Sequence, residues 1–200
     1  MARDGAAARE SEAAARRAYR PPRSVSRAAC LEGGRDDRLR ALLHAFFVTA
    51  ARFEDVRAAF GRRIGTSGPQ YTILAAMAEL QGADGVGVGA LAEHLHVAPS
   101  HITAEVNKLA ARGLVEKRAN PADGRGVLVR LARAGEGALD RLGPFRSEIN
   151  DLLFDGVSRA EFQALARLFD RFLVNTERAL DRIELEARER ERERKRNGHG

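Results

Sequence analysis

The residues with the clearest chemical potential lie between Pro99 and Arg112, a stretch whose spacing predicts a helix. Ile102, Val106 and Leu109 recur at intervals of three and four residues, so they predict a buried stripe. The opposite face carries hydroxyl, imidazole, amide and ammonium groups, which can bind base edges and phosphates. These polar residues are Ser100, His101, Thr103, Asn107 and Lys108. The pattern predicts a helix that enters a major groove of DNA.

A second set of charged residues follows this helix in a predicted β-hairpin. Alternating apolar residues predict strands over residues 114–118 and 127–131, and the turn-forming residues between them predict a loop over residues 119–126. We expect the hairpin to contact phosphates or a minor groove through its basic side chains. The residues concerned are Lys117, Arg118 and Arg125, together with Asp123, which would hold the Arg125 guanidinium by a charge-assisted hydrogen bond.

The elements that must position these side chains are helices. Residues 88–95 predict a short helix, and a tight turn at residues 96–98 leads into the next one. Upstream, the sequence predicts a long helix from residue 36 that ends at Gly61, and a second helix that begins at Pro69. The glycine-rich stretch that follows predicts a loop and a short strand. Helix, turn, helix and hairpin in this order predict a winged helix-turn-helix.

The chain after residue 131 also has a helical pattern. Pro144 is expected to kink or break the first of these helices. Ser158 and Glu161 have the spacing of a capping box, which starts a long amphipathic helix. Acidic and basic residues alternate over residues 184–196, so we predict a solvated helical extension supported by ion pairs between neighbouring turns. The fold class is therefore mainly α with a small β-hairpin wing and a helical dimerisation region.

Several motifs resemble the MarR family of bacterial regulators over about residues 36–185. In chain order they are Pro69–Tyr71, Leu91–Leu95, the helix Pro99–Arg112, Gly113–Val115 with Arg118, Asp123-Gly124-Arg125 and Ser158–Glu161. The resemblance implies a homodimer, joined through its first and last helices, that binds a short pseudo-palindromic operator. It also implies that the helix Pro99–Arg112 is the recognition helix.

The sequence departs from the family's pattern near this helix. Ala104 stands where the family often has Arg, and Glu105 stands where an apolar residue is common. Ala98 and Ala132 replace the Ser and Thr that usually cap the two helices following them. The family's base preference is therefore not transferable, whereas the intact inward-facing residues preserve the inference of fold.

Composition limits the classes of protein that the chain can be. Its 200 residues suffice for one domain with tails, and a net charge of +6 favours an anionic partner. The single cysteine, Cys30, excludes an intrachain disulfide framework and indicates a cytoplasmic protein. No run reaches the roughly 18 apolar residues of a membrane span. The sequence has no nucleophile–base pair, phosphate loop or cofactor signature, so neither an enzyme nor a bound cofactor is expected.

The predicted organisation has five parts. Residues 1–35 form a disordered basic tail, either solvated or lying on DNA phosphates as an arm. Residues 36–81 form the first helices, residues 82–131 the winged helix-turn-helix, and residues 132–187 the second group of dimerisation helices. Residues 188–200 form a charged, frayed tail.

The resemblance also implies an effector pocket between the DNA-binding lobe and the dimerisation helices. His44, Phe47, Arg52 and Tyr71 lie near that place in the sequence. Phe47 and Tyr71 would line a site for a small aromatic or phenolic anion, with His44 or Arg52 as counter-charge. The alternative is that the two aromatic residues are ordinary core residues.

Two other sites are disfavoured. His94 and His96 form a His-x-His pair without cysteine or carboxylate ligands at fixed spacing, so no metal site is expected. Cys30 lies beside two glycines in the predicted tail and not inside an aromatic-rich helical start, and the chain has no second cysteine to lock it, so redox sensing is not expected.

The sequence therefore predicts a sequence-specific DNA-binding transcriptional regulator, a ligand-responsive repressor that acts as a homodimer. The alternative is an architectural DNA-binding protein without an effector, which the basic tail and the altered recognition helix favour. A third interpretation, a protein-interaction module built on the terminal helix, requires the basic hairpin to be incidental.

Overall fold

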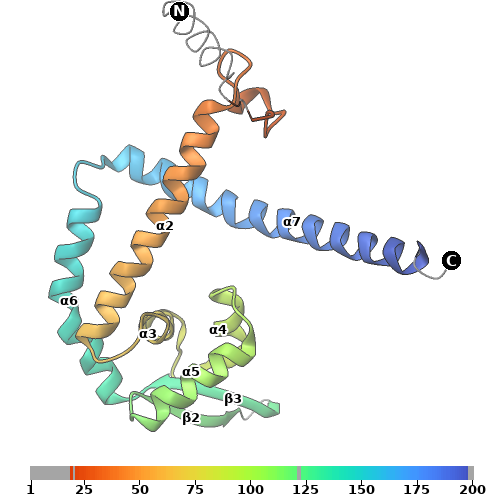
Figure 1. The fold of residues 1–200 in the computed structure, drawn as a ribbon. Coiled ribbons are helices and arrows are strands. Elements are labelled where there is room, and N and C mark those ends of the chain that lie inside the picture. Colours follow the sequence, from red (N-terminus) through yellow and green to blue (C-terminus); the bar gives the residue numbers. More distant parts are fainter. Residues whose placement is uncertain (1–18, 20, 121–122, 198–200) are drawn as a thin grey trace, which may run out of the picture. The chain divides into compact units, whose positions relative to one another are not determined.

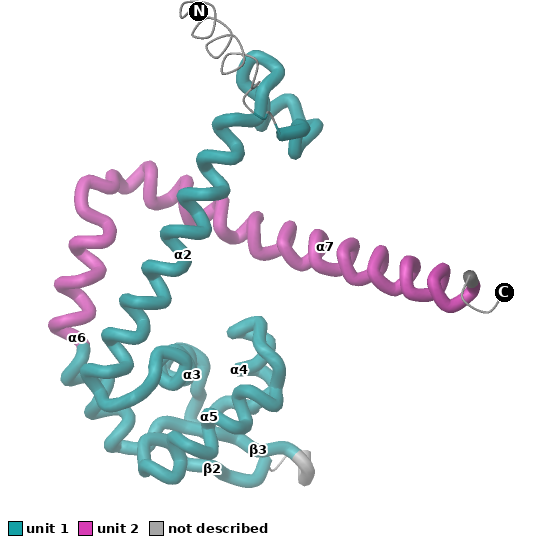
Figure 2. The backbone as a smooth tube through the Cα atoms, viewed as in Figure 1, with its two compact units in different colours: residues 1–142 teal, residues 143–200 magenta. Residues whose placement is uncertain are grey.

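The computed structural model describes residue 19, residues 21–120 and residues 123–197, without the side chains of residues 123–125 and 197. The chain divides into two compact units, residues 1–142 and 143–200, and the boundary falls within one helix (Figure 2). The elements, labelled in Figure 1, are η1 (Ala28–Cys30), α2 (Asp37–Arg63), α3 (Gly68–Leu80), β1 (Val86–Gly87), α4 (Val88–His94), α5 (Pro99–Ala111), β2 (Val115–Asn120), β3 (Asp123–Leu131), α6 (Arg133–Leu153) and α7 (Arg159–Asn197).

The predicted fold class is confirmed: the described chain is mainly helical, with one small antiparallel sheet. The strand order is β1-β3-β2, so the short strand β1 joins the hairpin at the edge of β3. Val86 pairs with Val129, and Lys117 pairs with the same residue from the other side. Within residues 1–142, α4, α5 and the hairpin gather at the end of α2 where the helix finishes (Figure 1).

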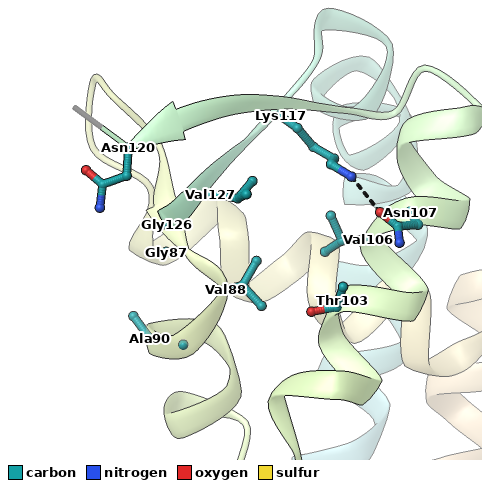
Figure 3. Close-up of a pocket in the computed structure, with 11 residues that line it drawn as sticks. Gly87, Val88, Ala90, Thr103, Val106, Asn107, Lys117, Asn120, Gly126 and Val127 are labelled. Carbon is teal, nitrogen blue, oxygen red and sulfur yellow. Dashed lines mark hydrogen bonds between the residues drawn. The ribbon is translucent and has the colours of Figure 1, made fainter. Parts of the chain in front are cut away.

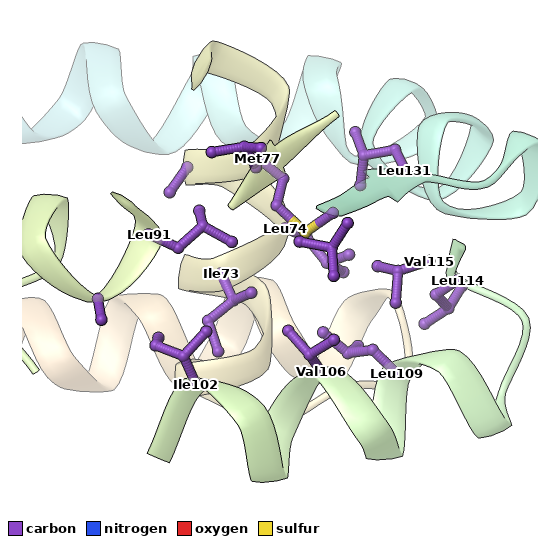
Figure 4. Close-up of a cluster of buried hydrophobic side chains, with 14 residues drawn as sticks. Ile73, Leu74, Met77, Leu91, Ile102, Val106, Leu109, Leu114, Val115 and Leu131 are labelled. Atoms are coloured by element: carbon purple, nitrogen blue, oxygen red, sulfur yellow. The ribbon is translucent and has the colours of Figure 1, made fainter. Parts of the chain in front are cut away.

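The core of the first unit joins the helices to the sheet. Residues from α3, α4, α5 and the strands form one buried apolar cluster (Figure 4). Its fully buried members include Ile73, Leu74, Met77, Leu91, Ile102, Val106, Leu109 and Val129. Burying each large aliphatic side chain contributes about 1.5–3 kcal/mol, so this cluster fixes α5 against α3 and the sheet.

Three helices end in the same way, which determines where the chain turns. Gly65, His96 and Gly113 follow the C-termini of α2, α4 and α5, and all have positive φ. Each end has the paired hydrogen bonds of a Schellman motif; after α5, for example, Leu114 N–H donates to Leu109 O and Gly113 N–H donates to Ala110 O. The turn between α4 and α5 thus resembles a glycine-capped helix end, although a histidine occupies the left-handed position.

The prediction that Gly61 ends the first helix was wrong, because α2 continues to Arg63. Gly65 takes the capping position instead. A Cβ on Gly61 would lie 2.6 Å from the Ser67 carbonyl oxygen. Because glycine has no Cβ, the segment that leads to α3 can pack closely against the end of α2. That connection ends in a capping box between Ser67 and Gln70, which starts α3 beside the predicted Pro69.

The predicted loop over residues 119–126 was too long. Strand β2 continues to Asn120 and β3 begins at Asp123, because backbone pairing extends through residues with turn-forming side chains. Ala119 pairs with Val127 and Asn120 pairs with Asp123, so the register shifts at this point. Residues 124–126 therefore form a bulge in β3 near the end of the hairpin.

The helices α6 and α7 confirm one prediction and correct another. Pro144 lies inside α6 without ending it, so a break, one of the two outcomes predicted, was wrong; the helix continues although the proline removes one backbone donor. The capping box before α7 is confirmed, since the hydroxyl and the N–H of Ser158 both donate to Glu161 Oε2. None of the described helices is long and apolar enough to cross a bilayer.

The predicted charged extension is also helical. Glu184 pairs with Arg188, Glu186 with Arg190, and Glu191 with Lys195, each four residues apart. Such pairs contribute about 0.2–0.5 kcal/mol each at an exposed helix surface. The last residues of the predicted frayed tail, 198–200, lie outside the described part of the chain.

Candidate nucleic-acid interface

Helix α5 buries one side and exposes the other, as its sequence predicts. Ile102, Val106 and Leu109 are fully buried in the core cluster. The five polar residues predicted to contact DNA are all exposed: Ser100, His101, Thr103, Asn107 and Lys108. Pro99 begins the helix without a side-chain cap, because Ala98 precedes it. The helix therefore presents a polar surface on a rigid apolar base.

A hydrogen bond joins this surface to the hairpin. The Nζ of Lys117, on β2, lies 2.6 Å from Oδ1 of Asn107 and donates to it (Figure 3). Because the bond occupies the amide oxygen, it directs the Asn107 NH₂ group, a donor, to other partners. Thr103 Oγ1 donates to the Pro99 carbonyl oxygen at 2.9 Å, so its hydroxyl offers acceptor lone pairs.

A groove of about 460 Å³ lies between α5, the start of α4 and the hairpin (Figure 3). Its lining contains small and apolar residues together with four polar residues, of which Thr103, Asn107 and Lys117 are predicted DNA contacts. The lining residues that matter here are Val88, Thr103, Asn107, Lys117, Asn120 and Val127. The groove therefore lies between the predicted DNA-contacting residues of α5 and those of the hairpin, which the hydrogen bond from Lys117 to Asn107 joins.

The buried face of α5 contains a charge whose role the sequence does not indicate. Glu105 is only 9% exposed, although it lies on the same helix as the exposed polar residues. Gln70 Nε2, on α3, donates to Glu105 Oε2 at 2.9 Å, and Lys108 Nζ donates to Glu105 Oε1 at 2.6 Å. The hydrogen bond from Lys108 is the main cause that lowers the pKa of Glu105, so the carboxyl group is ionised at neutral pH.

Charged residues of the hairpin also pair with one another. Glu116 Oε2 lies 3.4 Å from Arg130 Nε and 3.8 Å from Arg118 Nη2. Arg130 was not predicted as a site residue; the cross-strand pairing of residues 116 and 130 brings it beside the predicted Arg118. The side chains of Asp123 and Arg125 lie outside the described residues, so their predicted pairing stays a prediction.

Of the four predicted effector residues, the structure buries one and exposes the other three. Tyr71 is buried, and its ring meets the Phe60 ring edge-on with the centroids 5.4 Å apart. His44, Phe47 and Arg52 lie on exposed positions of α2, and Phe47 is 66% exposed. The core interpretation therefore fits Tyr71, whereas Phe47 is a surface residue of the single chain.

The residues of the disfavoured metal and redox sites lie in the first unit. His94 and His96 are exposed, and among the described residues no three histidine, cysteine or carboxylate side chains are grouped as metal ligands. Cys30, in η1, is partly buried and is a free thiol.

Comparison with known proteins identifies the fold. The sequence model of the MarR family matches residues 64–126, from the end of α2 to the hairpin. No curated protein sequence matches the chain. Three similar solved structures align with this chain over most of their own length and over about two thirds of this chain.

One of these structures is a mutant MarR from E. coli complexed with operator DNA, at 20% identity and TM-score 0.59, covering 68% of this chain and 96% of that one. PcaV from Streptomyces coelicolor, in complex with its natural ligand, is 26% identical at TM-score 0.52, covering 62% and 89%. A MarR/EmrR family regulator from Acinetobacter sp. ADP1 is 16% identical at TM-score 0.60, covering 70% and 96%.

The matched residues contain α5, its buried stripe and most of the hairpin, and the similar structures share the surrounding helical fold. Residues 64–126 therefore match the MarR family of regulators, and the chain has the winged helix-turn-helix fold of the solved MarR structures.

Proposed function

We propose that the protein is a homodimeric repressor that binds a pseudo-palindromic operator and releases it when a small aromatic or phenolic effector binds. The observation that supports sequence-specific DNA binding is the geometry of α5. This helix has a buried apolar stripe and five exposed polar residues beside the hairpin. Such a helix fits a major groove, where base edges differ in donor and acceptor pattern.

The side chains have separate roles in this proposal. Thr103 and Asn107 contact bases, and Ser100 and His101 contact bases or phosphate. The basic residues supply phosphate contacts, which set affinity and its dependence on salt. They are Lys117, Arg118 and Arg125, with Asp123 orienting Arg125, whereas Lys108 contacts a phosphate or a guanine base.

Exposed apolar side chains on α2 and in the second unit support a dimer. The apolar residues of α7 recur at helical spacing and are at least 40% exposed in the single chain; they include Phe162, Leu165, Phe169, Phe172, Leu180 and Ile183. On α2, Leu42, Phe46 and Phe47 are similarly exposed. A row of exposed apolar side chains along one helix is unusual on a soluble monomer, so we propose that a second copy of the chain covers these residues.

The dimer is tested by measuring mass in solution by light scattering. Phe172→Glu would place a charge in the proposed interface and is expected to produce monomers at micromolar concentration. Gln163→Glu, at an exposed polar position of the same helix, is the control and should stay dimeric. A monomeric protein without any substitution would contradict the proposal.

The repressor and architectural functions are distinguished by selecting bound genomic fragments with purified protein at near-physiological salt. Enrichment of a short inverted repeat supports a site-specific dimeric regulator. Broad retention without a motif, lost steeply as salt rises, supports the architectural alternative.

The proposed binding of an effector depends on residues of α2. His44 and Phe47 lie three residues apart and therefore share a face of the helix, where they would contact an aromatic anion. PcaV, a similar structure, was solved with a natural ligand. Aromatic and phenolic acids should release operator DNA from the protein, and His44→Ala should weaken that response. A screen in which no such acid releases DNA would contradict this part alone.

A further inference from the structure

Glu105 is a buried carboxylate beneath the proposed DNA-contacting surface of α5. Its residue is 9% exposed, and both carboxylate oxygens accept hydrogen bonds, one from Gln70 and one from Lys108. A buried charge is costly unless it is paired and hydrogen-bonded, and this one has both kinds of partner. Its neighbours on the buried stripe are apolar, so Glu105 contributes something other than packing.

Gln70 connects Glu105 to the start of α3. Its Oε1 accepts from Ser67 N–H at 3.3 Å, closing the capping box, while its Nε2 donates to Glu105 at 2.9 Å. The amide therefore cannot move without breaking either the helix cap or the contact with α5. The backbone of Ser67 in turn packs against Gly61 near the end of α2. Glu105 is thus fixed by the connection between α2 and α3.

Lys108 is fixed from the other side of the carboxylate. Its side chain is 61% exposed, whereas that of Glu105 is 11% exposed, so the pair extends from the interior to the surface. The ammonium group has three donors, of which Glu105 receives one, leaving donors that can bind DNA. A flexible lysine bound to a buried, immobile carboxylate loses much of its positional freedom before DNA arrives.

We propose that Glu105 is a positioning residue for operator recognition: held by Gln70, it fixes the ammonium group of Lys108 at one place on the DNA-facing surface and reduces its general attraction to phosphates. The inference rests on the proposed sequence-specific function. A lysine held in this way favours the DNA sequence that places an acceptor at that point. A lysine without this carboxylate would bind phosphates at many places, because phosphate attraction is independent of sequence.

The test compares affinity for the operator and for random DNA over a series of salt concentrations, using the full chain. Glu105→Gln keeps the shape and can still bond to Gln70 while removing the charge. We expect the ratio of operator to random affinity to fall by about tenfold, within the range for one base contact. The slope of log affinity against log salt on random DNA should steepen by about one unit as Lys108 becomes available to phosphates.

Two controls assign the effect to this network. Glu136→Gln, at an exposed position of α6, makes the same change in net charge and should leave the ratio unchanged. Adding Lys108→Met to Glu105→Gln should return the salt slope to its original value. If the slope stayed steep in the double variant, or if Glu105→Gln altered neither ratio nor slope while remaining folded, the proposal would be overturned.

A second pair of variants keeps the proposal testable if Glu105→Gln folds poorly. Gln70→Leu breaks the capping box and releases Glu105, whereas Ser67→Ala breaks the capping box alone. Both should lower the melting temperature, but only Gln70→Leu should lower the operator-to-random ratio. Equal ratios in the two variants would contradict the positioning role. If the original protein did not distinguish operator from random DNA, the proposed function would fail instead.

Discussion

Lys117 Nζ and Asn107 Oδ1 lie 2.6 Å apart, so one hydrogen bond joins the hairpin strand β2 to helix α5. The bond orients the Asn107 amide with its oxygen occupied and its NH₂ group left as the available donor. In the proposed complex that donor meets an acceptor on a base edge, such as N7 or O6 of guanine or O4 of thymine.

The first prediction concerns this pair. Asn107→Ala should relax base preference at one operator position, at a cost of about 1–3 kcal/mol for the preferred base. Lys117→Met should relax the same position, because the amide loses the partner that fixes it. Binding measured on operators with single base changes tests both variants. Loss of preference at different positions would mean that the hydrogen bond does not orient Asn107.

Arg125 provides the second prediction. Its backbone lies in the bulge of β3, and we propose a phosphate or minor-groove contact for its side chain. Arg125→Ala should weaken binding to all sequences and flatten the slope of log affinity against log salt by about one unit. Arg190→Ala, which removes a charge near the end of α7, is the control. An unchanged slope in Arg125→Ala would refute the phosphate contact.

The third prediction follows from the turn between α4 and α5. His96 has φ of 52° at a Schellman position where glycine is usual. His96→Gly should therefore raise the free energy of unfolding by about 0.5–1 kcal/mol, because relief of strain exceeds the extra freedom of the unfolded chain.

Urea titration of the His96→Gly variant measures this change. His94→Gly is a matched control, since residue 94 is the last helical residue of α4, where glycine should lower stability by less than the ~1 kcal/mol that it costs in a helix interior. A less stable His96→Gly variant would show that the histidine side chain contributes more than the strain costs.

Gly135 gives the fourth prediction. A Cβ at this position in the first turn of α6 would lie 2.2 Å from the backbone oxygen of Leu114. Gly135→Ala should therefore lower the free energy of unfolding by about 1–3 kcal/mol, the usual cost of forcing extra volume into a packed site.

Gly137→Ala is the matched control, two residues along the same helix. Its Cβ would meet only the flexible end of Arg141, at 3.3 Å, so the higher helix propensity of alanine should prevail. Thermal unfolding of both variants tests the contrast. Equal effects at the two positions would argue against the close contact between α6 and the segment that enters β2.

The sequence predicts the parts of the site that depend on local pattern. The spacing of Ile102, Val106 and Leu109 is sufficient to indicate which face of α5 is buried, since a helix places those positions on one side. The Ser158–Glu161 capping box was likewise predictable, because both partners lie within one helical turn.

The parts that depend on distant partners could not be predicted. Glu105 is identified as unusual from the sequence, but its bond to Gln70 spans 35 positions and depends on how α3 packs against α5. Glycine is common at helix C-termini, but Gly61 lies within α2, where the close packing of Ser67 requires a residue without a side chain. Gly65 takes the capping position at the helix end. The effector residues show the same limit, since sequence proximity does not reveal that Tyr71 is buried and Phe47 exposed.

The shift of register between Ala119 and Asn120 separates the hairpin into a base and an end. The base is tied to the core through Val115, Val129 and Leu131, whose side chains must keep their alternation. The bulge at residues 124–126 leaves the regular ladder, so extra or missing residues there need not change the pairing below it. Insertions and deletions at the end of the hairpin can therefore change its length without changing how α5 packs against the core.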